Sequence, residues 1–208
     1  MSLAEKLAQG IAELGLDVAA DIERKLLDYV ALIAKWNRVH NLTAVRDGAK
    51  IVSVHLLDCL AVVPSLEANT VLDVGSGAGL PGVPLALMWP HARVTLLDSS
   101  HKKAAFLRQT VIELGLKNAD VICERVEAWQ PAHPYDLVIS RAFSDLPEFL
   151  RLAGRLCAAK GTVATMKGLY PHEELAQLPR EFKLRSVVRL KVPGLPAERH
   201  LLLLSPVR

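Results

Sequence analysis

This sequence is poor in cysteine and in aromatic residues, and both shortages narrow the kinds of site it can form. Its 208 residues include 3 cysteines, and 5% of them are aromatic. Cys59, Cys123 and Cys157 are odd in number and show no Cys-x-x-Cys spacing. Neither a disulfide framework nor a zinc site is therefore indicated, and we expect no bound metal.

The sequence also shows no signal peptide and no apolar run that approaches membrane-spanning length. Its first residues, Met-Ser-Leu-Ala-Glu-Lys, are already charged and amphipathic. No internal repeat or low-complexity segment is visible. These features predict a cytoplasmic protein that does not bind a membrane.

Charge is nearly balanced, with a formal net charge of +3. Residues 1–69 carry 7 Lys and Arg against 9 Asp and Glu, whereas residues 70–208 carry 18 against 13. The basic excess therefore lies in the later part of the chain. It permits binding to nucleic acid without requiring it.

The N-terminal third predicts helices. Apolar residues recur at helical spacing over residues 3–15, 21–36 and 50–63, and Asp21 is placed to cap the second helix. A chain of 208 residues can bury one substantial core with a small appendage. We predict a helical extension over residues 1–66, packed on one compact core of residues 67–208.

The stretch around which the chain is organised runs from Thr70 to Gly82. A short apolar run, Val71–Val74, breaks into alternating glycines at positions 75, 77 and 79 and then into a helical pattern that opens with Pro81. A buried strand that turns tightly into a helix has this pattern. Because glycine has no side chain, such a turn lets a ligand approach the main chain.

From Thr70 onward, strand and helix patterns alternate, which predicts a parallel α/β sheet with helices on both faces. We expect strands over 71–74, 94–98, 119–124, 137–141 and 162–167, and helices over 82–88, 102–114 and 146–158. The tail predicts a hairpin of two strands, 184–192 and 200–205. A parallel sheet that ends in an antiparallel hairpin resembles the Rossmann-like, seven-stranded fold of class I S-adenosylmethionine-dependent methyltransferases.

Two classes of cofactor use a glycine loop of this kind. Gly77, Gly79 and Gly82 match the dinucleotide fingerprint, but the first glycine of that fingerprint should follow the strand directly, and Gly75 holds that place. Asp73 lies at the end of the strand, where a carboxylate can face an ammonium group. An acid before Gly-x-Gly-x-Gly resembles the first motif of class I methyltransferases, so we take Asp73, Gly75, Gly77 and Gly79 as candidate cofactor-binding residues. Dinucleotide binding stays open as the alternative.

Ligands of open parallel sheets lie beyond the carboxyl ends of the strands. Asp98 ends the second strand, where its carboxylate can accept both hydroxyls of a ribose, and Val126 and Glu127 follow the third strand, near an adenine. Asp98 could instead cap the next helix. Glu127 could be a surface acid.

The fourth strand ends at Ser140-Arg141. The chain has no Asn/Asp-Pro-Pro-aromatic motif there, and no Pro-Cys pair that could supply the nucleophile for cytosine chemistry. The Arg141 guanidinium can pair with a phosphate or donate to guanine. A structural ion pair is the other reading of this residue.

Several blocks, in this order and spacing, resemble the RsmG family, also called GidB or glucose-inhibited division protein B, which methylates guanine N7 in bacterial 16S ribosomal RNA. The resemblance runs from about residue 26 to the last strand. Its blocks are Asn41-Leu42-Thr43, His55-Leu56-Leu57-Asp58-Cys59-Leu60, Leu72 to Gly82, Leu97-Asp98-Ser99, Lys102-Lys103, Phe106-Leu107, Arg125-Val126-Glu127 and Ser140-Arg141-Ala142.

The resemblance implies S-adenosyl-L-methionine as cofactor, 16S ribosomal RNA or the small subunit as partner, and nucleotide 527 of the 530 loop as target. It also implies that Gly75, Leu80, Val126, Glu127 and Arg141 contact the cofactor, with Asp98 on the ribose. We expect the enzyme to act as a monomer.

Basic residues near the strand ends could present the RNA. We expect an RNA-binding face from Asn41, Lys102, Arg125, Lys167 and Arg199, and a catalytic group of His55, Arg141, Lys167 and Arg199. Two other hypotheses remain open: an NAD-dependent oxidoreductase that uses Asp98 for ribose, and a non-catalytic RNA-binding protein on the same fold.

Overall fold

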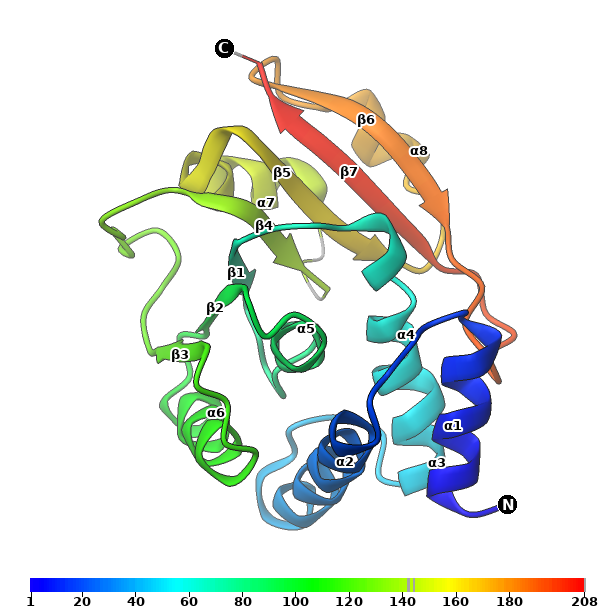
Figure 1. Cartoon of the computed structure of the whole chain (residues 1–208). Coiled ribbons are helices and arrows are strands. Elements are labelled where there is room, and N and C mark those ends of the chain that lie inside the picture. The colour runs from blue at the N-terminus through cyan, green and yellow to red at the C-terminus, as the bar shows by residue number, and fades with distance from the viewer. Residues whose placement is uncertain (142, 144, 208) are drawn as a thin grey trace.

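A twisted sheet runs through the molecule with helices on both of its faces (Figure 1). The structure is a computed structural model, and it describes residues 1–141, 143 and 145–207. Ala142, the last residue of the block Ser140–Ala142 that resembles the RsmG family, lies outside the described residues.

The N-terminal extension is helical, as predicted, but its third helix is not regular. The segments are α1 (Leu3–Glu13), α2 (Ala20–His40), α3 (Gly48–Lys50), the π-helix η1 (Ile51–Leu56), α4 (Leu57–Leu60) and the 3₁₀ helix η2 (Val63–Ser65). Apolar periodicity does not distinguish an α-turn from a π-turn, so the sequence did not reveal η1. Wider turns of this kind are frequent at functional sites.

The ends of the first two helices follow local rules only in part. Ser2 and Glu5 form a capping box at α1, in which the Ser2 hydroxyl accepts from Glu5 N at 3.1 Å. The prediction that Asp21 caps α2 was wrong. The N-cap residue is Ala19, and Asp21 lies in the first turn, where its charge still complements the helix dipole.

The sheet has seven strands in the order β3-β2-β1-β4-β5-β7-β6, as expected for the fold class. The strands are β1 (Thr70–Val74), β2 (Arg93–Leu97), β3 (Ala119–Ile122), β4 (Tyr135–Ser140), β5 (Cys157–Lys167), β6 (Phe182–Arg189) and β7 (His200–Pro206). The first five strands are parallel, and β7 pairs antiparallel with both β5 and β6.

The remaining helices are α5 (Gly82–Met88), α6 (His101–Glu113), α7 (Leu146–Ala153) and α8 (His172–Ala176), with a 3₁₀ turn η3 (Gly154–Leu156). The predicted helix over 146–158 is shorter, because β5 already begins at Cys157. At Gly161 the strand lies so close to β4 that a Cβ would stand 2.8 Å from the carbonyl oxygen of Asp136. The short helix α8 was not predicted.

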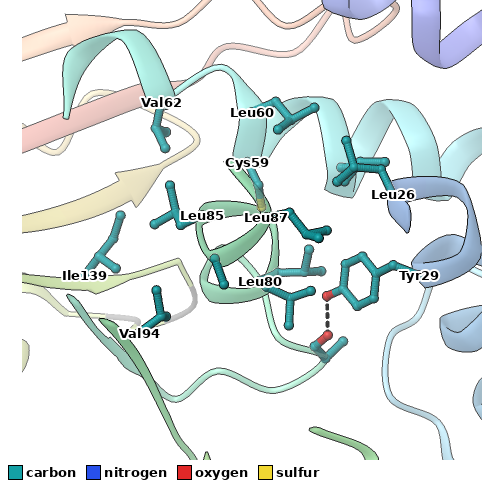
Figure 2. Packing of buried hydrophobic residues seen from close by; sticks show 14 of the residues in the cluster. Leu26, Tyr29, Cys59, Leu60, Val62, Leu80, Leu85, Leu87, Val94 and Ile139 are labelled. Atoms are coloured by element: carbon teal, nitrogen blue, oxygen red, sulfur yellow. Dashed lines mark hydrogen bonds between the residues drawn. The ribbon is translucent and has the colours of Figure 1, made fainter. Parts of the chain in front are cut away.

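Two apolar clusters cover the two sheet faces. One joins alternate strand residues such as Val71 and Val94 to the N-terminal helices, α5 and α6, and the other joins Leu72 and Val74 to α7. Figure 2 shows the first cluster, in which the Tyr29 hydroxyl donates to the carbonyl oxygen of Ala78 in the glycine loop. The N-terminal extension therefore shares its core with the sheet and supports the loop directly.

The segment Gly48–Ser65 is long and apolar enough to cross a membrane, with 18 residues and a mean hydropathy of 1.4. The expectation that no run approaches such a length was therefore wrong. In the structure, 61% of this segment is buried inside the protein, where it packs against α1, α2 and α5. The core helix of a soluble protein meets the same criteria of length and hydropathy.

Candidate functional site

A cavity of about 460 Å³ opens at the carboxyl ends of β1, β2 and β4. It lies where the order of the strands reverses, between β1 and β4, which is where open α/β sheets bind their ligands. We call this cavity the cofactor cleft. Its lining comprises Val74, Gly75, Leu97, Asp98, Ser99, Lys103, Glu124, Arg125, Val126, Glu127, Ser140, Phe143, Glu148 and Leu152.

The glycine loop gives the cleft one wall of bare main chain. Gly75 has a φ of +69°, and a Cβ built on it would meet no atom within 4 Å. Gly77 has a φ of +60°, and its nearest neighbour would be the carbonyl oxygen of Gly75 at 3.7 Å. Open space beside a left-handed main chain is what a closely approaching ligand requires.

The other two expected loop residues face the core instead. A Cβ on Gly79 would lie 2.6 Å from Val83 Cγ2, and Leu80 is buried among apolar residues. Of the predicted loop residues, Gly75 lines the cofactor cleft, and Gly77, Gly79 and Leu80 do not. Gly79 and Leu80 therefore pack the loop against the core and α5, and they do not form the surface that a ligand would contact.

Asp98 links the loop to the second strand. Its Oδ2 accepts from Gly77 N at 2.9 Å, its Oδ1 accepts from Ser100 N at 2.9 Å, and Lys103 Nζ lies 3.7 Å from Oδ2. Ser100, not Asp98, caps α6 with its side chain. Each carboxylate oxygen keeps a second lone pair, so the ribose interaction expected from the sequence is geometrically available.

The loop after β3 forms another wall of the cleft. It is held by Arg155, a residue that the sequence analysis did not predict. Arg155 Nη2 donates to the carbonyl oxygens of Val126 at 2.9 Å, Glu127 at 3.1 Å and Trp129 at 2.6 Å. Glu127 is solvent-exposed, and its own main-chain N–H, together with Arg125, lowers the pKa of its carboxyl group. Val126 and Glu127 line the cleft, as expected, and so does Arg125, which was expected on the RNA-binding face.

Asp73 does not face the cleft, contrary to the expectation from the sequence. Its side chain is fully buried, and Oδ2 accepts from Gly82 N at 2.9 Å, which ties β1 to the start of α5. Burial raises the pKa of this carboxyl group to about 7, against the effect of the Gly82 hydrogen bond. The carboxylate therefore has a structural role beneath the loop.

A second cavity, of about 620 Å³, lies at the carboxyl ends of β4 and β5. Arg141 and Lys167 line it together with Phe143, Tyr170 and the start of α8, which adds the acids Glu173 and Glu174. We call it the basic cavity after its two cations. Lys167 Nζ pairs with Glu174 at 2.7 Å and donates to the carbonyl oxygen of Phe143 at 3.3 Å. Phe143 lines both cavities, so they adjoin.

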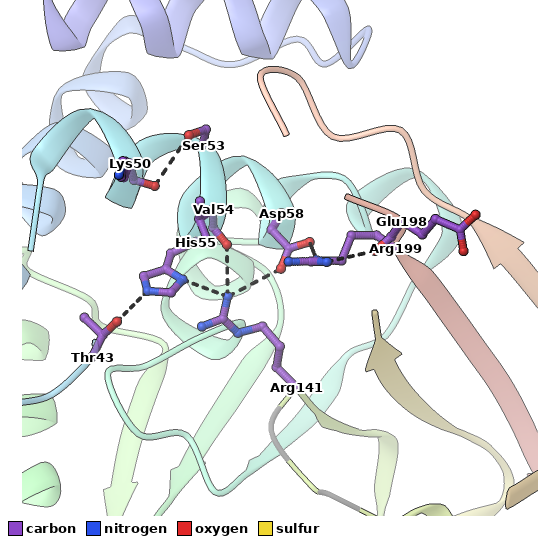
Figure 3. Close-up of polar contacts among 9 residues, drawn as sticks. All are labelled: Thr43, Lys50, Ser53, Val54, His55, Asp58, Arg141, Glu198 and Arg199. Carbon is purple, nitrogen blue, oxygen red and sulfur yellow. Dashed lines mark hydrogen bonds and ion pairs between the residues drawn. The ribbon is translucent and has the colours of Figure 1, made fainter. Parts of the chain in front are cut away.

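Arg141 lines the basic cavity and not the cofactor cleft, which differs from the expectation that it contacts the cofactor. Figure 3 shows its guanidinium turned toward the N-terminal extension. Nη1 lies 3.2 Å from His55 Nδ1, 3.4 Å from the carbonyl oxygen of Val54 and 3.4 Å from Asp58 Oδ2. These contacts hold Arg141 beside η1 and α4.

His55 and Arg199 join the same cluster as Arg141, as predicted, whereas Lys167, the fourth member of the predicted group, pairs with Glu174. His55 Nε2 lies 2.6 Å from Thr43 Oγ1, and Arg199 Nε lies 3.2 Å from Asp58 Oδ1. Burial, followed by the nearby Arg141, lowers the pKa of His55 to about 4, so the ring is neutral at pH 7. Burial raises the pKa of Asp58, against both arginines. Asp58 was part of a quoted block but was not predicted as a site residue.

Two expected RNA-binding residues lie elsewhere. Asn41 is exposed and ends α2 in the left-handed conformation, with its Oδ1 accepting from Arg46 at 3.1 Å. Lys102 is exposed on α6, and its neighbour Lys103 is the residue that lines the cleft. Among residues 1–141, 143 and 145–207, no three His, Cys, Asp or Glu side chains are grouped to hold a metal ion.

Strand order, cleft position and glycine loop define the fold of the class I S-adenosylmethionine-dependent methyltransferases. A SAM-dependent methyltransferase from Aquifex aeolicus matches with a TM-score of 0.57 and 20% identity, over 76% of this chain and 93% of that one. TrmN from Thermus thermophilus matches with a TM-score of 0.54 and 21% identity, over 72% and 47%. At these identities the likeness shows the fold alone.

The chain belongs to the rRNA small subunit methyltransferase G family, whose model, also called GidB, matches residues 22–202. Ribosomal RNA small subunit methyltransferase G of Laribacter hongkongensis is 55% identical over 205 residues, which cover 99% of both chains. The protein of that name from Nitrosospira multiformis is 53% identical over 212 residues, 99% of this chain and 98% of the relative. The family resemblance in the sequence is thus confirmed, and S-adenosyl-L-methionine is the cofactor. The hypothesis of an NAD-dependent oxidoreductase is therefore rejected.

Proposed function

We propose that this protein transfers the methyl group of S-adenosyl-L-methionine to N7 of a guanine in the 16S RNA of the small ribosomal subunit. The observation that carries the proposal is the adjacency of the two cavities across Phe143. One cavity has the bare loop and the acid suited to an adenosyl ligand. The other has the guanidinium of Arg141 and the ring of Tyr170, which are suited to a nucleotide, while Glu174 pairs with its second cation, Lys167.

The residues of the cofactor cleft fit that ligand. The open main chain at Gly75 leaves room for the methionine part, and Asp98 offers acceptor positions for ribose hydroxyls. Val126 and Glu127 flank the place of the adenine, on a loop that Arg155 holds. When bound, the cofactor supplies an electrophilic methyl group.

The chemistry at guanine N7 asks little of the protein. N7 has an in-plane lone pair and carries no proton, so no general base has to act. Accordingly, none of Cys59, Cys123 and Cys157 lines either cavity, and neutral His55 is engaged with Thr43 and Arg141. Alignment of the base with the methyl group is then the main contribution, and in well-oriented systems it reaches about 7–11 kcal/mol.

The basic cavity can supply that alignment. The guanidinium of Arg141 can donate to guanine O6 while N7 stays free. Lys167, paired with Glu174 at 2.7 Å, fixes the wall of the cavity beside it. Tyr170, 38% exposed, offers a ring for stacking. Arg199 stands close by, with Nη1 3.8 Å from a Cβ built on Gly168.

Labelled cofactor tests the proposal. The protein should transfer label to the RNA of small subunits, given as naked RNA or as particles, and not to the RNA of large subunits. Binding of small-subunit RNA without any transfer would favour the non-catalytic RNA-binding hypothesis. Binding of neither RNA would overturn the proposal.

We further infer that the enzyme acts as a monomer in the cytoplasm, where small subunits assemble. Sedimentation of the active fraction at the mass of one chain is the expected result. Nucleotide 527 as the target remains a prediction, and mapping the modified nucleotide tests it.

A further inference from the structure

A single buried carboxylate lies between two arginines that come from distant parts of the chain. Asp58, 3% exposed in α4, contacts Arg141 Nη1 with Oδ2 at 3.4 Å and Arg199 Nε with Oδ1 at 3.2 Å. The contact to Arg199 lies at ion-pair distance without hydrogen-bond geometry. Arg141 follows β4 and Arg199 precedes β7, so the fold brings them together at Asp58 (Figure 3).

Two guanidinium groups held side by side repel each other, and a carboxylate between them offsets that repulsion. Both arginine side chains are mostly covered, at 20% and 22% exposure, so water screens the pair only in part. Removing the carboxylate would leave two adjacent cations without a counter-charge. Each would then move toward solvent, away from the other.

His55 fixes the orientation of the first arginine. Its Nδ1 faces the cationic Arg141 Nη1, so Nδ1 is the acceptor and the proton lies on Nε2, toward Thr43 Oγ1. Nη1 is thus engaged by His55, Val54 and Asp58. Within the described part of the chain, the other guanidinium nitrogens of Arg141 have no hydrogen-bond partner, and Arg141 lines the basic cavity.

We propose that Asp58 is a positioning residue that holds two cations, Arg141 in the wall of the basic cavity and Arg199 beside Gly168 at its edge, as a fixed pair that binds the incoming RNA nucleotide. The proposal rests on the proposed function, since it names the residue behind RNA binding at that site. Asp58 does not touch the nucleotide. It acts through the geometry of the two arginines.

The direction in which RNA affinity changes in Asp58→Asn distinguishes a positioning role from a purely electrostatic one. Asp58→Asn removes a negative charge beside an RNA site, so long-range electrostatics alone predicts tighter RNA binding. Positioning predicts the opposite, because the freed arginines pay a larger ordering cost on binding. A purely structural role would lower the melting temperature and leave the Michaelis constant for RNA unchanged.

The experiment compares Asp58→Asn with Asp136→Asn in the full chain. Asp136 is a matched control, because its carboxylate accepts main-chain N–H groups of Asn69 and Thr70 at the far end of the sheet. We expect Asp58→Asn to raise the KM for small-subunit RNA about tenfold, with unchanged affinity for S-adenosylhomocysteine by calorimetry. The control should keep the wild-type KM. Equal or tighter RNA binding by Asp58→Asn would overturn the proposal.

A second variant guards against misfolding of the first. Arg199→Lys keeps the charge of a partly exposed side chain but loses the planar fork. Positioning predicts a higher KM for RNA in this variant, whereas a point charge predicts no change. In the Arg199→Lys background, Asp58→Asn should add less than it does in the wild type, and full additivity would contradict the proposal.

A readout that needs no RNA keeps the two proposals apart. The Arg199 Nε–H signal should be resolved by ¹⁵N NMR in the wild type and broadened by exchange in Asp58→Asn. An unchanged signal would refute the positioning role even if methylation is confirmed. Conversely, absence of methylation by the wild type would refute the proposed function, whatever the NMR result.

Discussion

The main-chain N–H of Gly77 donates to Oδ2 of Asp98 across 2.9 Å. This bond joins the glycine loop after β1 to the acid after β2, so the two sides of the cleft that we propose for methionine and ribose form one unit. Gly75 and Ser76 reinforce it, because their N–H groups both donate to the carbonyl oxygen of Leu97, at 2.8 and 3.0 Å. Loop geometry and acid position are therefore coupled.

Asp98→Asn should weaken binding of S-adenosylhomocysteine at least about tenfold, because the amide can replace only one of the two acceptor oxygens. Calorimetry measures the change. Asp120→Asn is the control, since Asp120 is exposed on neighbouring β3 and outside the cleft. Loss of equal size in both variants would show that the effect is not specific to the cleft.

Gly75→Ala should also reduce cofactor affinity, by several-fold or more, because its Cβ enters open cleft space and strains a left-handed main chain. Gly115→Ala isolates the strain. Gly115 has a φ of +61°, a Cβ built there meets nothing within 4 Å, and it lies after α6, away from the cleft. Both variants should lose similar thermal stability, and only Gly75→Ala should lose affinity for S-adenosylhomocysteine. Undiminished affinity would mean that the ligand does not approach Gly75.

Arg155→Ala should release the loop that carries Val126 and Glu127, because one guanidinium nitrogen holds three of its carbonyl oxygens. We expect a several-fold higher dissociation constant for S-adenosylhomocysteine and faster proteolysis of this loop. Arg151→Ala is matched to it, since Arg151 lies one turn earlier and forms a surface pair with Glu148 instead of holding the loop carbonyls. If the two variants behave alike, Arg155 does not support the cleft.

Asp73 and His55 should give opposite pH dependences of stability. From about pH 4 to 7 folded Asp73 keeps a proton that the unfolded chain releases, so the free energy of unfolding falls as pH rises. From pH 6.5 down to about 4 the unfolded chain binds a proton that folded His55 does not, so the free energy of unfolding falls as pH drops. In the wild type the two trends oppose each other.

Single replacements separate these trends. As the pH rises from 4 to 7, the free energy of unfolding of Asp73→Asn should increase relative to that of the wild type. The free energy of unfolding of His55→Gln should decrease relative to that of the wild type over the same range. Melting temperatures in a pH series measure both. A curve parallel to the wild type in either case would mean that the group titrates as in the unfolded chain.

Most of the fold could be predicted from the sequence, because the patterns that indicate strands, turns and helices involve residues close together in the chain. The strand–glycine–helix pattern at Val71–Gly82 and the alternation after it follow from which residues are buried, and the hairpin at the end follows from its turn residues. Contacts between residues far apart in the sequence could not be predicted in this way. Arg155 meets the loop after β3 across a helix and a strand, and Asp58 meets Arg199 only once β7 is in place.

Side-chain direction was the other limit. Asp73 and Gly79 belong to a motif that borders a cofactor, yet both face the core, because strand alternation and the turn of the loop point them inward. Lys102 and Lys103 are neighbours on α6, and only the helical rotation selects Lys103 for the cleft. The sequence placed Arg141 at the end of β4, but it did not show which cavity the guanidinium would line.

Nucleoside analysis of the methylated RNA tests the central claim most directly. Small-subunit RNA treated with the protein and cofactor, then digested and analysed by mass spectrometry, should contain 7-methylguanosine, and RNA made with 7-deazaguanine should accept no methyl group. A methyl group found on another atom, or on the 7-deaza RNA, would contradict the account.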